Sequence, residues 1–149
     1  MNKLYEFLHP VTSQEERDVV ISKRFIQRNE EGNPILDENG NVVPKPFRVR
    51  AISQAENDTL VKKATTTYRD RTGAKNSDFD RVKYIRSLVV AGTVEPDFRM
   101  KEICDAFGVL DPEMVPGAML YAGEYQRLAD AIAELSGIGD EDVEGEAKN

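Results

Sequence analysis

The sequence predicts an α+β fold, in which an N-terminal antiparallel β-hairpin or meander precedes a mainly α-helical bundle of about five helices. Two segments that alternate in polarity as strands do lie within the first 52 residues and are joined by glycine turns. Beyond them, apolar residues recur at steps of three and four, as on one face of a helix. A chain of 149 residues has the length of one domain, which we expect to span residues 1–138.

Composition and charge argue against a membrane protein and against a nucleic-acid binder. No run approaches the roughly 18 apolar residues of a membrane span, and the start lacks the pattern of a signal peptide, so we expect a cytosolic protein. Residues 1–75 hold 13 basic and 11 acidic side chains, whereas residues 76–149 hold 7 and 16. Such an acidic second half does not offer the clustered positive face that phosphate contact needs.

The N-terminal segment carries an apolar patch that needs a surface to lie on, because a helix this short is not stable by itself in water. Two alternatives stay open at this point. The patch packs on its own domain, or it binds a partner. Its members are Leu4, Tyr5, Phe7 and Leu8.

Two strands and the turns between them are predicted next. The first strand covers residues 18–26 and is rich in β-branched residues. The second covers residues 45–52, where Phe47, Val49 and Ala51 face one way and Arg48 and Arg50 the other. Between them, residues 30–34 and 38–42 form two similar glycine turns that begin eight residues apart. This arrangement predicts the antiparallel hairpin or three-stranded meander.

The second turn resembles the opening of a calcium-binding loop, but the match fails. Asp37, Asn39 and Asn41 offer oxygen ligands at alternate positions, which is what Ca²⁺ needs. The glycine comes at the fourth position instead of the sixth, and the twelfth position is Arg48, where a bidentate carboxylate is required. We therefore expect no metal here and no cofactor elsewhere.

A capping box and a glycine delimit the first long helix. Ser53 and Glu56 have the spacing at which each side chain accepts a backbone N–H of the other residue. This helix is predicted to run through a charged last turn and to end at Gly73. A central helix is predicted over residues 78–91, and its apolar stripe consists of Phe79, Val82, Ile85, Leu88 and Val89. The charged residues Arg81, Lys83 and Arg86 lie off that stripe.

Shorter helical segments follow. One covers residues 97–107, and residues 111–112 open another with Asp as the N-cap and Pro at the first helical position. Pro116-Gly117 interrupts that helix. The last helix covers residues 122–136 and ends at a glycine, and its apolar stripe consists of Tyr125, Leu128, Ile132 and Leu135. Residues 139–149 are acidic and have no apolar stripe, so we expect a disordered tail.

No catalytic constellation is recognisable. Cys104 is the single cysteine and lies in an apolar pattern, as a small buried hydrophobic residue does. The only histidine, His9, precedes a proline and has no second histidine or cysteine nearby in the sequence, so we assign it no catalytic role. No phosphate-binding glycine loop or hydrolase motif occurs. We expect a non-enzymatic, acidic interaction protein.

Several short motifs follow one another in a specific order along the chain. They are Leu4 to Leu8, Phe47 to Ser53, Gly92 to Asp97, Gly108 to Met114, Met119-Leu120, Gly123-Glu124-Tyr125 and Glu134 to Gly137. In this order they resemble the XkdN-like tail assembly chaperones, which belong to prophages and phages of Gram-positive bacteria. The resemblance covers roughly residues 3 to 138.

The resemblance implies that residues 1–138 form a tail-assembly-chaperone-like domain. Members of the family are thought to coat the tape measure protein of long-tailed phages and to help recruit tail tube subunits around it. The implied partners are the tape measure and tail tube proteins of the same phage, in the host bacterial cytoplasm, with the chaperone absent from the mature virion and a homo-oligomer allowed. Members are often made in two lengths by frameshifting, and the acidic tail is where an extension would begin.

Apolar residues near the two ends of the domain are the candidates for partner binding. A chaperone of apolar helices needs an exposed hydrophobic groove; alternatively, the same residues close the core against each other. A rival function from another class is a small acidic adaptor or regulatory protein that binds a basic protein partner. The candidate residues are Leu4, Phe7, Leu8, Tyr121, Tyr125 and Leu128.

Overall fold

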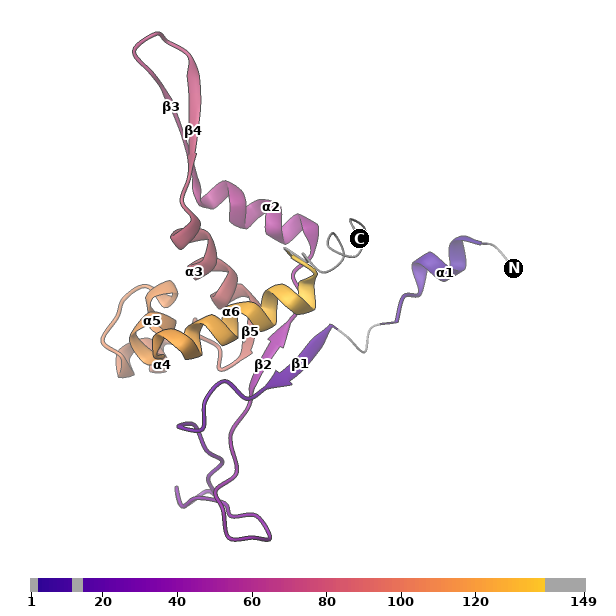
Figure 1. Cartoon of the computed structure of the whole chain (residues 1–149), viewed down its shortest axis with the longest axis vertical. Coiled ribbons are helices and arrows are strands. Elements are labelled where there is room, and N and C mark those ends of the chain that lie inside the picture. Colours follow the sequence, from indigo (N-terminus) through magenta and orange to yellow (C-terminus); the bar gives the residue numbers. More distant parts are fainter. Residues whose placement is uncertain (1–2, 12–14, 139–149) are drawn as a thin grey trace, which may run out of the picture.

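A three-stranded antiparallel sheet joins segments that are far apart in the sequence (Figure 1). The computed structural model describes residues 3–11 and 15–138. The fold is mixed α/β, as predicted, but the third strand comes from the middle of the chain and not from its N-terminal part. In the sheet order β1-β2-β5, the strands are β1 (Glu16–Val19), β2 (Phe47–Arg50) and β5 (Thr93–Glu95).

Two long helices pack on each other, and the second of them also lies on the sheet. They are α3 (Arg81–Gly92) and α6 (Ala122–Ser136), and α6 contacts both β1 and β2. At Gly92 the absence of a Cβ lets Ile132 of α6 pack directly against the backbone of α3. The most deeply buried core side chains include Ile21, Val49, Val89, Phe98, Leu128 and Ile132.

The apolar stripe predicted for the central helix is buried only in its C-terminal half. Leu88 and Val89 lie in the core, whereas Phe79 and Val82 are 51% and 59% exposed. The helix begins later than predicted, because the Asp80 carboxylate accepts the backbone N–H of Lys83 at 3.1 Å and so caps it. Phe79 therefore precedes the helix, and the predicted burial of its N-terminal half was wrong.

Helix α2 (Gln54–Lys63) starts at the predicted capping box, with both reciprocal hydrogen bonds formed between Ser53 and Glu56. The guanidinium of Arg50 pairs with the Glu56 carboxylate and also donates to the Ala91 carbonyl at 2.9 Å. That hydrogen-bonded pair holds the pKa of Glu56 at about 2. Arg50 thus connects β2, the start of α2 and the end of α3.

The prediction that this helix runs to Gly73 was wrong. The helix ends at Lys63, and the chain then forms a hairpin of β3 (Thr65–Arg69) and β4 (Lys75–Phe79), which projects from the body (Figure 1). Three consecutive β-branched threonines begin β3, and such residues favour strands. Gly73 serves the hairpin turn instead, with a positive φ of 83°.

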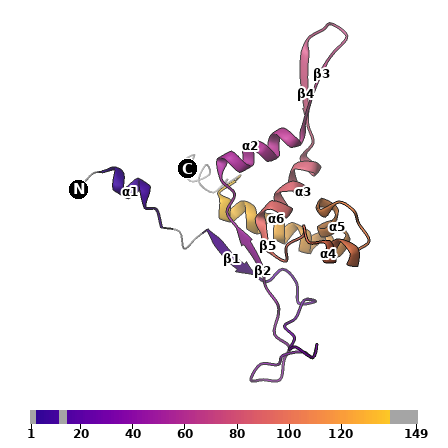
Figure 2. The same ribbon diagram turned by 180° about the vertical axis from the view of Figure 1, so that it is seen from behind.

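An arm formed by residues 25–45 leaves the sheet in the direction opposite to that hairpin (Figures 1 and 2). Its two turns are the predicted glycine turns, with positive φ at Gly32 and Gly40. Three backbone hydrogen bonds close a ring, in which Gln27 donates to Val43, Val43 to Ile35 and Ile35 to Gln27, at 2.8, 3.3 and 2.9 Å. The strand predicted over residues 18–26 was therefore wrong beyond Val19, where the chain turns into this arm.

Each turn of the arm is stabilised by the side chain of its first residue. Asn29 Oδ1 accepts the backbone N–H groups of Glu31 and Asn33, and Asp37 Oδ1 accepts those of Asn39 and Asn41. Side-chain acceptors of this kind mimic a backbone turn. The carboxylate that resembled a calcium ligand is therefore part of a turn.

Short helices make up the rest of the described chain. Pro116-Gly117 does not break a helix as predicted, because Pro116 stands at the start of one, where its missing N–H costs no hydrogen bond. Gly108 and Gly137 have positive φ after the helices that they end. These helices are α1 (Leu4–Leu8), α4 (Lys101–Ala106), the 3₁₀ helix η1 (Pro112–Met114) and α5 (Val115–Met119).

None of the helices among the described residues has the length and apolar character needed to cross a membrane. The prediction of a disordered acidic tail concerns residues 139–149, which lie outside the described residues.

The space around Gly92 and Gly117 predicts different effects of substitution by alanine at these two glycines. In Gly92→Ala, the new Cβ would lie 2.5 Å from Ile132 Cγ2, so we expect the free energy of unfolding to fall by about 1 to 3 kcal/mol. Gly117→Ala meets nothing within 4 Å and lies in a helix, so it should leave stability unchanged or raise it by up to about 1 kcal/mol. Urea denaturation of both variants tests this, and equal stabilities would contradict it.

Candidate functional site

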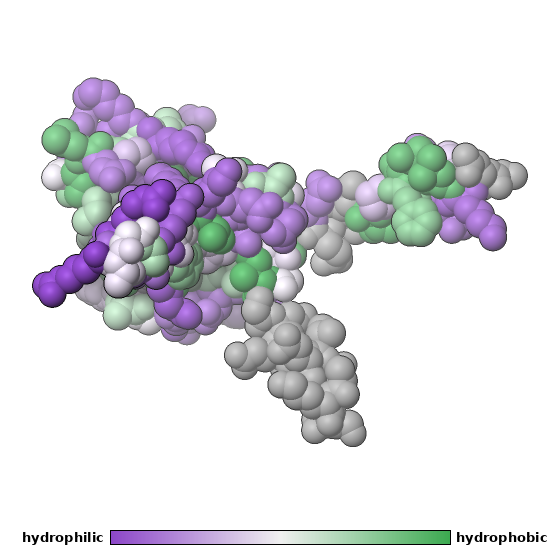
Figure 3. Space-filling model, turned by 90° about the horizontal axis from the view of Figure 1, so that it is seen from above, coloured by the Kyte–Doolittle hydropathy of each residue, from purple (hydrophilic) through white to green (hydrophobic). Residues whose placement is uncertain are grey.

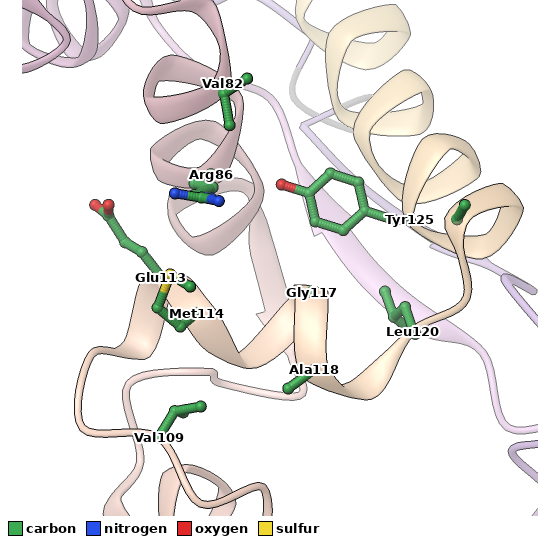
Figure 4. A pocket seen from close by; sticks show the side chains of 10 residues that line it. Val82, Arg86, Val109, Glu113, Met114, Gly117, Ala118, Leu120 and Tyr125 are labelled. Atoms are coloured by element: carbon green, nitrogen blue, oxygen red, sulfur yellow. The ribbon is translucent and has the colours of Figure 1, made fainter.

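A groove opens between α3, α5 and α6, on the side of α3 that the core does not cover (Figure 4). We call it the α3–α5–α6 groove. It has a volume of about 670 Å³. Its lining residues are Val82, Arg86, Val109, Glu113, Met114, Gly117, Ala118, Leu120, Ala122 and Tyr125.

Small residues leave room in the groove, and one aromatic ring forms part of its wall. Gly117 and Ala118 come from α5 and Ala122 from the start of α6. A Cβ added at Gly117 would meet no atom within 4 Å. Figure 4 shows the ring of Tyr125 pointing from α6 towards α3. Bulky apolar side chains of a partner can therefore enter the α3–α5–α6 groove.

Two charged side chains stand at the groove. Arg86 of α3 is half-buried and pairs with no carboxylate among the described residues. Glu113 of η1 is already engaged, since it accepts the Ser87 hydroxyl at 2.8 Å and pairs with Lys63. Burial raises the pKa of Tyr125, which Arg86 partly offsets. A partner that brings a carboxylate to Arg86 would complete this arrangement.

The apolar lining of the groove suits the binding of a helix. Apolar grooves between helices commonly hold the apolar face of another helix, with flanking polar contacts for orientation. Within the described part of the chain, no three residues of the types His, Cys, Asp and Glu gather as a metal site would require. The groove therefore has the chemistry of a docking site for an amphipathic helix.

The residues predicted to bind a partner fall into separate places in the structure. Tyr125 lines the groove, Tyr121 lies at the start of α6, and Leu128 is completely buried in the core, where it supports α6 from inside. Leu4, Phe7 and Leu8 all lie exposed on α1.

Tyr121 is engaged in an ion-pair cluster at the base of the arm. The guanidinium of Arg24 lies 4.0 Å from the Tyr121 ring centroid and forms two hydrogen bonds with the carboxylate of Glu124. Glu124 Oε1 also accepts the Tyr121 backbone N–H at 2.8 Å. Although 67% of Tyr121 is exposed, one face of its ring thus covers a cation. This cluster fixes the arm to the start of α6.

Helix α1 lies away from the body in both ribbon views (Figures 1 and 2), and none of its residues is buried. Figure 3 shows hydrophobic side chains on this projecting segment. The Tyr5 ring stacks on His9 with centroids 4.0 Å apart, which is a contact within the segment itself. The N-terminal patch and the final helix therefore do not close one core against each other.

Sequence reasoning missed most of the groove. Val82 was assigned to the buried stripe of the central helix, and Arg86 to its solvated face. Met114 and Gly117 come from short elements about thirty residues further along the chain. The one available signal was the apolar stripe of the last helix, which includes Tyr125. The positions of α3 and α5 beside that helix are set by the tertiary fold, which local patterns do not predict.

A family model and a relative of known name place the chain in one family. The family model described as Phage XkdN-like tail assembly chaperone protein, TAC, matches residues 4–148. The chain is 33% identical over 138 residues to the phage-like element PBSX protein XkdN of Bacillus subtilis strain 168, which covers 91% of this chain and 85% of the relative. It is 34% identical over 139 residues to YqbN of the same strain, with the same coverage. A crystal structure of YqbN superposes with a TM-score of 0.64 at 28% identity, covering 92% of this chain and 96% of that one.

The ion pair at the base of the arm predicts a loss of stability in acid. Hydrogen bonds from Arg24 lower the pKa of Glu124 from 4.5 to about 2. Because the folded state holds this proton more weakly than the unfolded state, its contribution is present above about pH 4.5 and is lost as the pH falls towards 2. In Glu124→Gln, we expect lower stability at pH 7 and a smaller decrease in acid, as measured by urea denaturation across this range.

In Glu124→Gln, part of the pH dependence of stability should remain, because the pKa of Glu56 is also about 2. Arg24→Met should reduce the slope of stability against pH as Glu124→Gln does, since it removes the cation that pairs with Glu124. Slopes equal to that of the parent protein in both variants would contradict the assignment.

Proposed function

The chain belongs to the XkdN-like tail assembly chaperone family, and from this premise we propose that it binds the tape measure protein and aids recruitment of tail tube subunits during assembly of a long phage tail. It acts by stoichiometric binding and not by catalysis. We place this action in the host bacterial cytoplasm, with the protein absent from the finished virion, and assign it to one domain of residues 1–138.

The observation that carries this proposal is the α3–α5–α6 groove. A tape measure protein is a long chain with apolar helical segments that need cover until the tail tube encloses them. The groove offers apolar walls from Val82, Met114 and Tyr125, and space above Gly117. Apolar side chains at positions i, i+3 and i+4 of a client helix would fill it.

Arg86 adds a chemical preference to this fit. It is a half-buried cation beside an apolar groove, with no carboxylate partner among the described residues. A cation in this position is stabilised by an acceptor that the client supplies. The preferred client segment is therefore an amphipathic helix whose apolar face is flanked by Asp or Glu.

The first test is co-expression of the full chain with the tape measure protein encoded beside it. Soluble tape measure protein that co-purifies with the chain supports the proposal. Aggregation of the tape measure protein regardless of this chain, and of any longer frameshifted form, would contradict it and favour the acidic adaptor.

Gly117→Leu is expected to abolish this co-purification, with at least a tenfold loss of client affinity. The added side chain projects into open space in the groove, so it blocks the client and leaves the fold intact. Binding is measured by pull-down and by titration of the co-purified client segment, and folding by thermal denaturation.

Gly123→Leu is the matched control. Gly123 is also an exposed helical glycine with open space around it, where the nearest atom to an added Cβ is Arg127 Nη1 at 4.0 Å, but it does not line the groove. This variant should bind the client as the parent does. If both leucine variants bind the client equally well, the client binds outside the groove.

A further inference from the structure

We propose that the β3–β4 hairpin is a second binding surface, which takes an acidic protein segment. This segment belongs to the same client whose amphipathic helix fills the α3–α5–α6 groove, so the identity of the partner rests on the proposed function. The charge of the hairpin, the exposure of its side chains and its connection to the groove all support this assignment.

The hairpin, the end of α2 and the first half of α3 form a positively charged region in an acidic chain. Residues 62–86 hold 8 basic and 3 acidic side chains, whereas the whole chain has a net charge of −7. Lys63 pairs with Glu113. Besides Arg86, the other basic side chains of this range are exposed and form no ion pair with any residue in the described part of the chain. They are Lys62, Arg69, Arg71, Lys75, Arg81 and Lys83.

Two of the three carboxylates in this region already bind backbone groups. In the hairpin turn, Asp70 Oδ1 accepts the backbone N–H groups of Thr72 and Ala74 at 2.9 and 3.0 Å. Asp80 caps α3. The third carboxylate, that of Asp78, is exposed on β4. The carboxylates of the region are therefore too few to pair with its cations, and acceptors from a partner can form charge-assisted hydrogen bonds with them.

The hairpin projects from the body (Figures 1 and 2), which separates its charges from the acidic side chains elsewhere. Each of its strands has five residues and extends about 17 Å. Exposed charges are largely screened beyond about 10 Å at moderate ionic strength. All side chains of β3 after Thr65 are exposed, and 44% of Tyr68 is accessible. The hairpin therefore presents its own positive field to a partner.

The second strand of the hairpin leads directly into the wall of the groove. Strand β4 ends at Phe79 and α3 begins two residues later, so the exposed side chains of Phe79 and Val82 lie at the junction of hairpin and groove. Lys63, at the end of α2, connects the base of the hairpin to Glu113 of the groove. A client that fills the groove is thus brought to the base of the hairpin.

This combination of surfaces favours an acidic protein segment over a nucleic acid. A nucleic acid could meet the cations of the hairpin, but it has no apolar helix for the groove beside them. The acidic remainder of the chain also repels the dense charge of its phosphates. A protein segment supplies both kinds of contact. We expect an amphipathic helix that adjoins about five extended residues rich in Asp or Glu, because that length matches β3.

The test uses two double variants of the full chain, each of which removes two positive charges. The hairpin variant is Arg69→Gln/Lys75→Gln. The control is Lys23→Gln/Arg28→Gln, at exposed positions in and just ahead of the arm. The two arginines are matched, because each donates to the carbonyl of the glycine in its own turn, at 2.9 and 3.0 Å. Thermal denaturation verifies folding.

Binding is measured first without a client, by fluorescence anisotropy of labelled poly-L-glutamate in about 0.1 M salt. A single-stranded oligothymidylate with the same number of charges is the second probe. We expect poly-L-glutamate to bind the parent and the control equally, and the hairpin variant about fivefold more weakly, since two exposed ion pairs are lost. No binding by the parent, or equal binding by all three proteins, would overturn the proposal. Tighter binding of the oligothymidylate through the hairpin would also overturn it, because the surface would then suit nucleic acid.

The co-purified client segment then shows whether the client uses this surface. Its affinity for the hairpin variant should be about fivefold lower than for the parent, with a weaker dependence on salt. If Gly117→Leu blocks the client but the hairpin variant binds it as the parent does, the proposed function stands and the hairpin proposal is overturned. If no form of the chain binds the client while poly-L-glutamate distinguishes the variants, the proposed function fails and the hairpin remains a surface for acidic segments.

Discussion

The close contact between Gly92 and Ile132 determines how α3 and α6 cross, and the groove depends on that crossing. The two helices meet near their C-terminal ends, where α3 has no side chain to hold them apart. Their N-terminal halves carry Arg86 and Tyr125, which line the groove. The short helix α5 closes the third side. The binding surface is thus a product of helix packing, and its residues need no special local conformation.

Local signals in the sequence predicted those elements whose ends are marked by particular residues. The capping box at Ser53, the two glycine turns of the arm, and the last helix with its terminal Gly137 all occur as predicted. The helix expected to end at Gly73 did not, because a glycine with positive φ serves a hairpin turn as well as a helix end. Threonines after Lys63 were the better signal, since β-branched residues favour strands.

The groove was largely beyond prediction for a different reason. Tyr125 was identified from the stripe of its own helix, but Arg86 and Gly117 belong to other elements and meet it only through the tertiary fold. A charged residue off an apolar stripe is usually solvated, and nothing in the local pattern distinguishes Arg86 from such a residue. The apolar surface on α1 was visible in the sequence, because a short apolar helix must find a surface.

The arm of residues 25–45 has almost no hydrophobic core and is held by hydrogen bonds among its own backbone groups. Its ring of hydrogen bonds through Gln27, Ile35 and Val43 is closed, and each turn has a side-chain acceptor. Its tips at Gly32 and Gly40 are exposed and do not line the groove. Loop tips of this kind tolerate inserted residues. The arm is therefore a suitable position for an epitope or a fluorescent label, through which the protein could be followed during tail assembly.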